Sequence, residues 1–372
     1  MRLGVLFVFL GLDFGVKQLA NHFKGIRKEG EPTLRTRDEV FNHGILPNRS
    51  ADEEFGPLKA PYHSNSLGLR DSHVRDVPPC GPNFRVLFLG NSFTEGGGFP
   101  WEDIFVGRVQ KALQGEGVEV LNGAVASYSP LLCRLKVEDL ILKKKIRIDM
   151  VVMCLDVGTV RDVYFFEETP EGTSRFLPYG PFQAQAARLA RADFVCQWLE
   201  KNVEKNFVVL GAVTRNLRLL YLAQTRDDGL GLMDTIPDWA YNWPEYQGPQ
   251  EKLIREGLAR SERQMEDLAS FLQQQKVRLA VVVYPWPQQI RAGKADSRMV
   301  TFWSNWCHRH GAFFLSVFPD FLSQGLPDEI LRAYYIEGDR HWNVGGHRLV
   351  AGALLDPRRG LPLWIGESRR NP

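Results

Sequence analysis

The segment 89–96 places a serine where a catalytic nucleophile would be exposed. Its sequence is Leu-Gly-Asn-Ser-Phe-Thr-Glu-Gly, so that Ser92 follows an apolar stretch, a glycine and an asparagine. Open parallel sheets bind ligands at the carboxyl ends of their strands. A serine just beyond such an end can present its hydroxyl to a substrate, and its backbone N–H can stabilise a developing oxyanion. The alternative is a serine that only caps the following helix, a position at which serine is favoured.

An Asp-x-His pair near the C-terminus supplies the base that such a serine needs. Asp339 and His341 are two residues apart, and in an extended stretch residues i and i+2 project to the same side. The carboxylate can then orient the imidazole and stabilise its charged form while the ring takes the proton of Ser92. A surface ion pair and a structural histidine are the alternatives. The position of the pair after the last predicted strand and before the last predicted helix favours the catalytic role, whereas we expect His347 to pack or to cap that helix.

Two turns, 122–130 and 156–159, follow the second and third predicted strands. Both lie at carboxyl ends of strands and are therefore expected beside Ser92, where they can supply further oxyanion donors. The alternative is ordinary turn chemistry, which Asn, Gly and Ser favour in any case. Four side chains near this edge are candidates for substrate contacts: Asn91, Asp156, Thr159 and Trp286. Trp286 is equally well explained as part of the core, and a salt bridge is the expected role of Arg161 and Asp162.

The order of these segments resembles the SGNH/GDSL hydrolase superfamily over residues 85–355, apart from a long insertion. The Gly-Asn-Ser sequence that ends at Ser92 is similar to the family's Gly-Asp-Ser block, with Asn91 in place of the usual aspartate. Asp339 and His341 are similar to its closing Asp-His block. The resemblance implies Ser92 as nucleophile, His341 as base and Asp339 as the group that orients the base. It implies neither a metal nor an organic cofactor.

The predicted oxyanion hole departs from the family pattern. The resemblance assigns it to the backbone N–H groups of Ser92, Ala124 and Gly158. The family usually has glycine at the Ala124 position, and an asparagine side chain in the block that 156–159 matches, where this chain has none. A bacterial subgroup with an atypical third block is similar to this chain. Because the loss of one oxyanion donor costs on the order of 10²-fold in rate, we expect a less efficient site with its nucleophile and base intact.

Alternating apolar runs and helical patterns position these residues. Apolar runs at 86–89, 118–121, 150–155, 279–284 and 312–317 predict five buried strands, and the patterns at 101–113, 131–145 and 349–355 predict helices. Continuous apolar strands between helices indicate a parallel sheet that is covered on both faces. The predicted fold is therefore a three-layer α/β/α sandwich with a parallel sheet of about five strands, and the resemblance implies the SGNH-hydrolase (flavodoxin-like) type.

The chain divides into an N-terminal apolar segment (1–23), an N-terminal extension (24–84) and a hydrolase domain (85–360) with an insertion at about 163–250. Within the extension, residues 62–71 are expected to lie over the main domain as an ordered approach segment. The apolar run at 3–12 has the length and basic start of a signal peptide, but it is short for a spanning helix. It predicts an exported or membrane-anchored protein, with a cytoplasmic location as the alternative. The insertion is expected to be a lid or substrate wall, or an elaboration that only packs.

Charge and cysteine content limit the partners. The chain has 46 Lys and Arg against 44 Asp and Glu, a net charge of +2, so nucleic acid is not an expected partner. Its five cysteines form no Cys-x-x-Cys pair, which argues against a zinc site. The family resemblance, together with the predicted export, implies a serine esterase that acts on a small-molecule or carbohydrate ester, such as an O-acetyl group on envelope or extracellular carbohydrate. A polysaccharide O-acyltransferase and a catalytically silent carbohydrate-binding or assembly protein stay open as alternatives.

Overall fold

An eight-stranded sheet runs through the part of the chain that the computed structural model describes, residues 34–55, 58–177 and 251–370. Its order is β12-β11-β8-β6-β7-β5-β4-β3. The first five strands in this order are parallel: β12 (Phe313–Ser316), β11 (Arg278–Val283), β8 (Met150–Leu155), β6 (Phe84–Leu89) and β7 (Val118–Asn122). These are the five predicted strands, and the predicted parallel sheet is confirmed. Every residue of β8 is buried, which explains its continuous apolar sequence.

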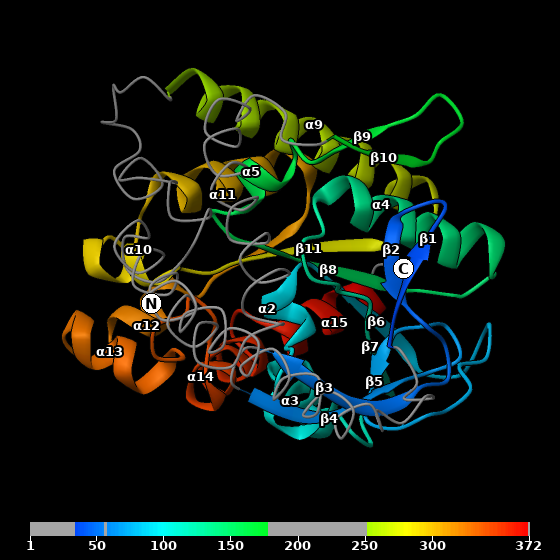
Figure 1. Ribbon diagram of the computed structural model, residues 1–372, viewed down its shortest axis with the longest axis horizontal. Helices are drawn as coiled ribbons and strands as arrows, with labels where there is room; N and C mark the ends of the chain where they lie inside the picture. The colour runs from blue at the N-terminus through cyan, green and yellow to red at the C-terminus, as the bar shows by residue number, and fades with distance from the viewer. Residues whose placement is uncertain (1–33, 56–57, 178–250, 371–372) are drawn as a thin grey trace, which may run out of the picture. The chain divides into compact units, whose positions relative to one another are not determined.

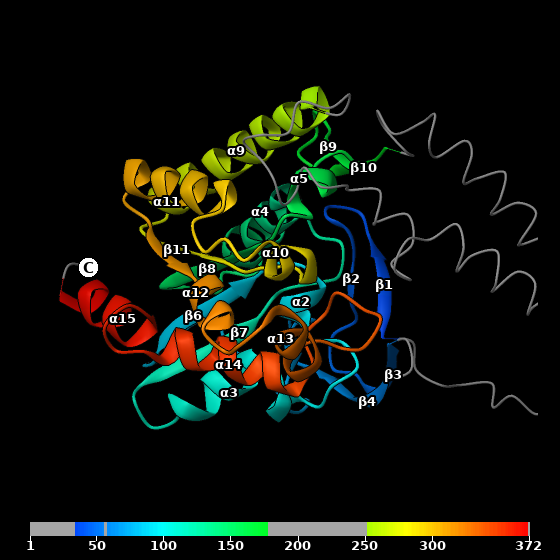
Figure 2. The same cartoon turned by 90° about the vertical axis from the view of Figure 1, so that its left-hand side faces the viewer.

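Helices cover both faces of this sheet (Figures 1 and 2). One face carries α4 (Pro130–Glu138), α9 (Glu251–Gln274) and α11 (Arg298–His310), and the other carries α3 (Phe105–Ala112), α14 (Val344–Leu355) and α15 (Leu361–Arg370). The three-layer α/β/α fold class is therefore confirmed. The last predicted helix starts earlier than expected, at Val344, because the Asn343 side chain accepts hydrogen bonds from the N–H groups of Gly345 and Gly346 and caps it.

Shorter elements complete the described structure. The predicted helix at 101–113 is divided into the 3₁₀ turn η1 (Trp101–Asp103) and α3, and the one at 131–145 continues from α4 into the π-helical η2 (Asp139–Lys143). The remaining elements are β1 (Arg35–Asp38), β2 (Asn42–Ile45), α2 (Ser92–Glu95), α5 (Thr159–Asp162), β9 (Phe166–Glu168), β10 (Ser174–Phe176), α10 (Pro287–Ala292), α12 (Phe318–Leu322) and α13 (Pro327–Tyr334).

The N-terminal extension is part of the sheet, which differs from the prediction. Three of its strands, β3 (Ser50–Phe55), β4 (Leu58–Ser64) and β5 (Arg70–Asp71), continue the sheet beyond β7 in antiparallel pairing. Residues 62–71 therefore do not lie over the main domain. Polar residues and a proline obscured these strands, because an edge hairpin is exposed on alternate residues and lacks the continuous apolar run of a central strand.

Several predicted features fall outside the described residues. They are the N-terminal segment 1–23 and most of the insertion, including the helical stretch at 183–199 and the aromatic stretch at 236–246. The described start of the insertion forms the antiparallel hairpin of β9 and β10. Within the described ranges, none of the helices has the length and apolar character that crossing a membrane requires.

Candidate active site

The structure brings Ser92, His341 and Asp339 together in one hydrogen-bonded chain. Ser92 Oγ lies 2.7 Å from His341 Nε2, and His341 Nδ1 lies 2.6 Å from Asp339 Oδ1. The same Asp339 oxygen accepts a hydrogen bond from the His341 backbone N–H at 2.8 Å. With Nδ1 facing a carboxylate, the ring nitrogen that carries the proton is Nδ1, and the lone pair of Nε2 points at the serine hydroxyl. This is the geometry of an activated serine nucleophile.

Ser92 is placed by the turn that follows β6. Gly90 has φ +155°, and a Cβ at this position would lie 2.6 Å from Thr94 Oγ1, so only glycine fits. Asn91 is the N-cap of α2, and its side-chain oxygen accepts a hydrogen bond from Phe93 N at 3.2 Å. Ser92 is therefore the first residue of the helix and not its cap, and its hydroxyl is available to His341.

The imidazole of His341 is packed between two aromatic rings. The Phe93 ring centroid lies 4.6 Å from it, and Phe55 at the end of β3 contacts it edge-on at 5.0 Å. Burial acts to raise the pKa of Asp339, but the hydrogen bonds and the charge of His341 outweigh it and lower that pKa to about 2. Asp339 is thus an anion at neutral pH and can stabilise an imidazolium. Sequence reasoning missed Phe55, because no local pattern reveals that an edge hairpin reaches the base.

Asn91 and Asp156 support the strand ends, whereas the prediction made them substrate contacts. Asn91 Nδ2 donates to Asp156 Oδ2 at 2.8 Å, and the Tyr284 hydroxyl lies 2.9 Å from the same oxygen and 3.0 Å from Asn91 Oδ1. The side chains come from the ends of β6, β8 and β11 and are buried, Asp156 to 1% exposure. Because water reaches them so little, their role is to hold three turns together.

Thr159 and Trp286 are also buried, which favours the core alternative for Trp286. The Trp286 ring is stacked with Phe93 at 6.5 Å, and the Arg340 guanidinium lies over it at 4.8 Å. Trp286 therefore packs against the residue that follows Ser92. Thr159 starts α5, where its backbone N–H donates to the Asp156 carbonyl at 3.1 Å.

The predicted oxyanion donors differ in their availability. Ser92 opens α2, where the first N–H groups of a helix lack intrahelical acceptors. The Ala124 N–H, in contrast, already donates to Asn122 Oδ1 at 3.2 Å, so its predicted role requires a shared hydrogen bond. Gly158 allows no side chain, since a Cβ there would lie 2.8 Å from the Trp286 ring and 2.9 Å from an Asp156 oxygen.

Other expectations near the site are resolved by contacts. Arg161 and Asp162 form the expected ion pair. His347 packs against the rings of Phe105 and Trp342, as one of its two expected roles requires, and it accepts a hydrogen bond from Phe105 N at 3.3 Å, at the start of α3. Among the residues in the described ranges, no three His, Cys, Asp or Glu side chains are grouped so that they could hold a metal ion.

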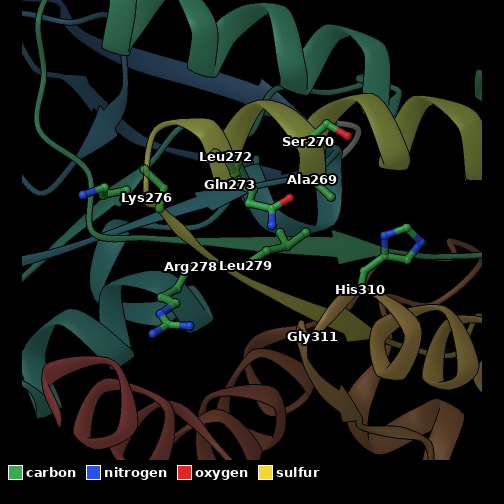
Figure 3. A pocket seen from close by; sticks show the side chains of 10 residues that line it. Ala269, Ser270, Leu272, Gln273, Lys276, Arg278, Leu279, His310 and Gly311 are labelled. Carbon is green, nitrogen blue, oxygen red and sulfur yellow. The ribbon is translucent and has the colours of Figure 1, made fainter. Parts of the chain in front are cut away.

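A cavity of about 430 Å³ lies away from this site, between the ends of α9 and α11 and the start of β11 (Figure 3). Arg278 pairs with Met150 at the amino-terminal ends of parallel strands, whereas Ser92 follows a carboxyl end. Of the other basic lining residues, His310 lies in the last turn of α11, where a cation stabilises the helix dipole, and Lys276 lies two residues beyond the end of α9. The cavity therefore adds nothing to the Ser92 site.

Comparison with known proteins gives matches in structure alone. No family model and no curated protein sequence matches the chain. Among solved structures, the chain is similar to TesA, at 11% identity and a TM-score of 0.36 over 73% of this chain and 98% of that one. It is also similar to the acetylxylan esterase Axe2 from Geobacillus stearothermophilus (14%, 0.37, 75% and 95%) and to the acetyl xylan esterase AlAXEase (15%, 0.37, 73% and 97%).

Proposed function

We propose that this chain is a serine hydrolase of the SGNH/GDSL type that cleaves an ester bond. The observation that carries the proposal is the hydrogen-bonded chain from Ser92 Oγ through His341 to Asp339, at the carboxyl edge of a parallel sheet. A buried structural histidine would not need a hydroxyl on one nitrogen and an ionised carboxylate on the other. The order of the three residues in the sequence agrees with the family resemblance.

The geometry assigns a role to each group. Ser92 Oγ attacks the ester carbonyl while His341 Nε2 takes its proton, and Asp339 stabilises the imidazolium that forms. The Ser92 N–H at the start of α2 faces the developing oxyanion. His341 then returns the proton to the leaving alcohol, which gives an acyl-enzyme on Ser92. A water molecule, deprotonated by the same imidazole, releases the acid and restores the serine.

For the substrate we propose an acyl ester on carbohydrate, such as an O-acetyl group on an envelope or extracellular polysaccharide. The family resemblance supports the small acyl group, and the apolar run at 3–12 supports export or a membrane anchor. Transfer of the acyl group to a sugar hydroxyl in place of water would use the same three residues. Product analysis with a sugar acceptor present separates hydrolysis from transfer.

The proposal is tested with a fluorophosphonate probe and a small acetyl ester. We expect the wild-type chain to be labelled and to hydrolyse p-nitrophenyl acetate, and Ser92→Ala to do neither. Ser72→Ala is the matched control, because among the described residues its hydroxyl is hydrogen-bonded to Asp71 and His73 alone, and it should behave as wild type. A folded wild-type protein that is inert to both reagents would refute the hydrolase and leave a silent binding or assembly protein.

A further inference from the structure

The carboxylate of Glu95 is buried three residues after the nucleophile. Glu95 ends helix α2, and 1% of its surface is exposed. Its Oε1 accepts a hydrogen bond from the Tyr62 hydroxyl at 3.0 Å, and its Oε2 accepts one from Ala126 N at 2.7 Å. The Arg35 guanidinium contacts the two oxygens at 2.7 and 3.1 Å. One charged group thus joins three segments that are distant in the sequence.

The turn 123–127 lies beside the segment 88–95, which contains Ser92, and forms three hydrogen bonds with it. The three hydrogen bonds run from Gly123 N to Phe88 O at 2.8 Å, from Val125 N to Gly90 O at 3.3 Å and from Ala126 N to the Glu95 carboxylate. Of the three acceptors, only Glu95 is a side chain. The hydrogen bond from Ala126 N to Glu95 is therefore the one that a side-chain substitution can remove without altering the backbone of β6.

The turn needs this hydrogen bond because its backbone conformation is strained. Ser127 has φ +66°, in the left-handed region that residues with a Cβ avoid. Such a residue keeps its conformation only where neighbouring contacts impose it. The preceding residue is held through both of its backbone polar groups, since Ala126 N donates to Glu95 and Ala126 O lies 2.9 Å from His43 Nε2.

The N-terminal extension supplies the charge that keeps Glu95 ionised. Burial alone would raise the pKa of Glu95, but the charge and hydrogen bonds of Arg35, the Ala126 N–H and the charge of Arg70 lower it below its ordinary value. Arg35 lies on β1, and Arg70 on β5 also donates to the Glu95 backbone oxygen at 2.6 Å. A carboxylate in this setting accepts stronger hydrogen bonds than a neutral amide would.

We infer that Glu95 is a positioning residue, which uses the N-terminal strands to fix the turn 123–127 against the Ser92 segment. The inference rests on the proposed function for its catalytic consequence. The turn contains Ala124, one of the predicted oxyanion donors, and its displacement would change the surroundings of the reacting carbonyl. Glu95 touches no reacting atom and acts through the backbone of Ala126.

The experiment compares Glu95→Gln with Glu119→Gln. The amide has one oxygen, so it cannot accept from both Tyr62 and Ala126 while also neutralising Arg35. Glu119 near the start of β7 is a matched control, because its carboxylate also accepts from two groups, Arg75 at 2.9 Å and Arg85 at 2.7 Å. We expect Glu95→Gln to lower kcat for an acetyl ester by about 10- to 100-fold, as a displacement of about 1 Å does. KM should change by less than ~3-fold, as for a group that acts in the transition state.

Hydrogen exchange supplies a readout that does not need activity. In Glu95→Gln the amides of 123–127 should exchange faster than in wild type, and in Glu119→Gln they should not. Unchanged exchange in this turn, or an equal loss of kcat in Glu119→Gln, overturns the inference. If wild type proves inert to esters and to the fluorophosphonate probe, the proposed function fails, and the exchange of the turn still decides the role of Glu95.

Discussion

Replacement of Asp339 by asparagine should remove the negative charge of this side chain while its hydrogen bonds to His341 are kept. Asp339 Oδ1 accepts both from the His341 backbone N–H at 2.8 Å and from Nδ1 at 2.6 Å. In Asp339→Asn the backbone N–H still selects the amide oxygen over the amide nitrogen, so the oxygen also stays opposite Nδ1. The proton therefore stays on Nδ1, and the change removes only the negative charge. In serine proteases the corresponding change selects the wrong tautomer and costs about 10⁴-fold.

The expected cost follows from the loss of one charge next to the imidazolium. Two unit charges about 4 Å apart interact by ~4 kcal/mol at an effective dielectric constant of 20. The Asp339 side chain is 39% exposed, and solvent screening reduces the interaction to about half, ~2 kcal/mol. This corresponds to a loss of roughly 30-fold in kcat. Asp339→Ala also removes the hydrogen bond to Nδ1, worth about 1.5–3 kcal/mol for a charged acceptor, so we expect a loss on the order of 10³-fold.

The assay is the steady-state hydrolysis of an acetyl ester by wild type, Asp339→Asn and Asp339→Ala. Ser92→Ala gives the background rate, and thermal unfolding confirms that each variant is folded. We expect kcat to decrease in the order wild type, Asp339→Asn, Asp339→Ala. If Asp339→Asn lost as much activity as Asp339→Ala, the backbone N–H would not hold the amide oxygen in place. If neither lost activity, Asp339 would have no part in catalysis.

Two further substitutions test the packing around the site. Burial, and then the nearby charges of Arg70, His341 and Arg108, lower the pKa of His347 to about 3. Below pH ~6.5 the unfolded chain binds a proton at this histidine and the folded chain does not. The free energy of unfolding therefore decreases as the pH falls from about 6.5 toward 3, by about 2–3 kcal/mol at pH 4.5. His347→Gln should remove this part of the acid destabilisation in urea unfolding measured at pH 7.5 and 4.5, and an unchanged pH dependence would contradict the assignment. Gly158→Ala would force Trp286 or Asp156 to move and should lower kcat by at least ~10-fold. The control Gly352→Ala lies in α14 with no atom near the added Cβ and should keep full activity, with stability unchanged or raised by up to ~1 kcal/mol.

The central sheet and the proximity of Ser92, His341 and Asp339 were predictable because each depends on a local pattern. A strand buried on both faces shows a continuous apolar run, as at 150–155, and the turns at carboxyl ends of parallel strands must share one edge. Ser92 follows such an end and the Asp339–His341 pair precedes the helix α14, so the sequence pattern predicted that they would meet. The hydrogen bond itself was a prediction that the sequence alone could not test.

The supporting contacts were not predictable, because they depend on which polar partner each group finds in three dimensions. The Asn122 side chain accepts the hydrogen bond of the Ala124 N–H. The sequence pattern of a turn does not reveal that this predicted oxyanion donor already has an acceptor. Asp156 was assigned to the substrate because it follows a strand, yet Tyr284 and Asn91 bury it. Polar residues at a strand end can face the ligand or tie neighbouring turns together, and burial alone distinguishes the two.

The packing of His341 explains why a neutral residue at position 339 should leave the imidazole in place. Phe93 contacts the imidazole from the nucleophile helix, and Phe55 contacts it from the N-terminal extension. Aromatic contacts of this kind restrict where a ring can lie independently of its charge state. The ring therefore stays near Ser92 when Asp339 becomes neutral, and the loss in Asp339→Asn reports the missing charge. The extension thus contributes two contacts near Ser92, through Phe55 at the His341 ring and through Arg35, which pairs with Glu95 of α2.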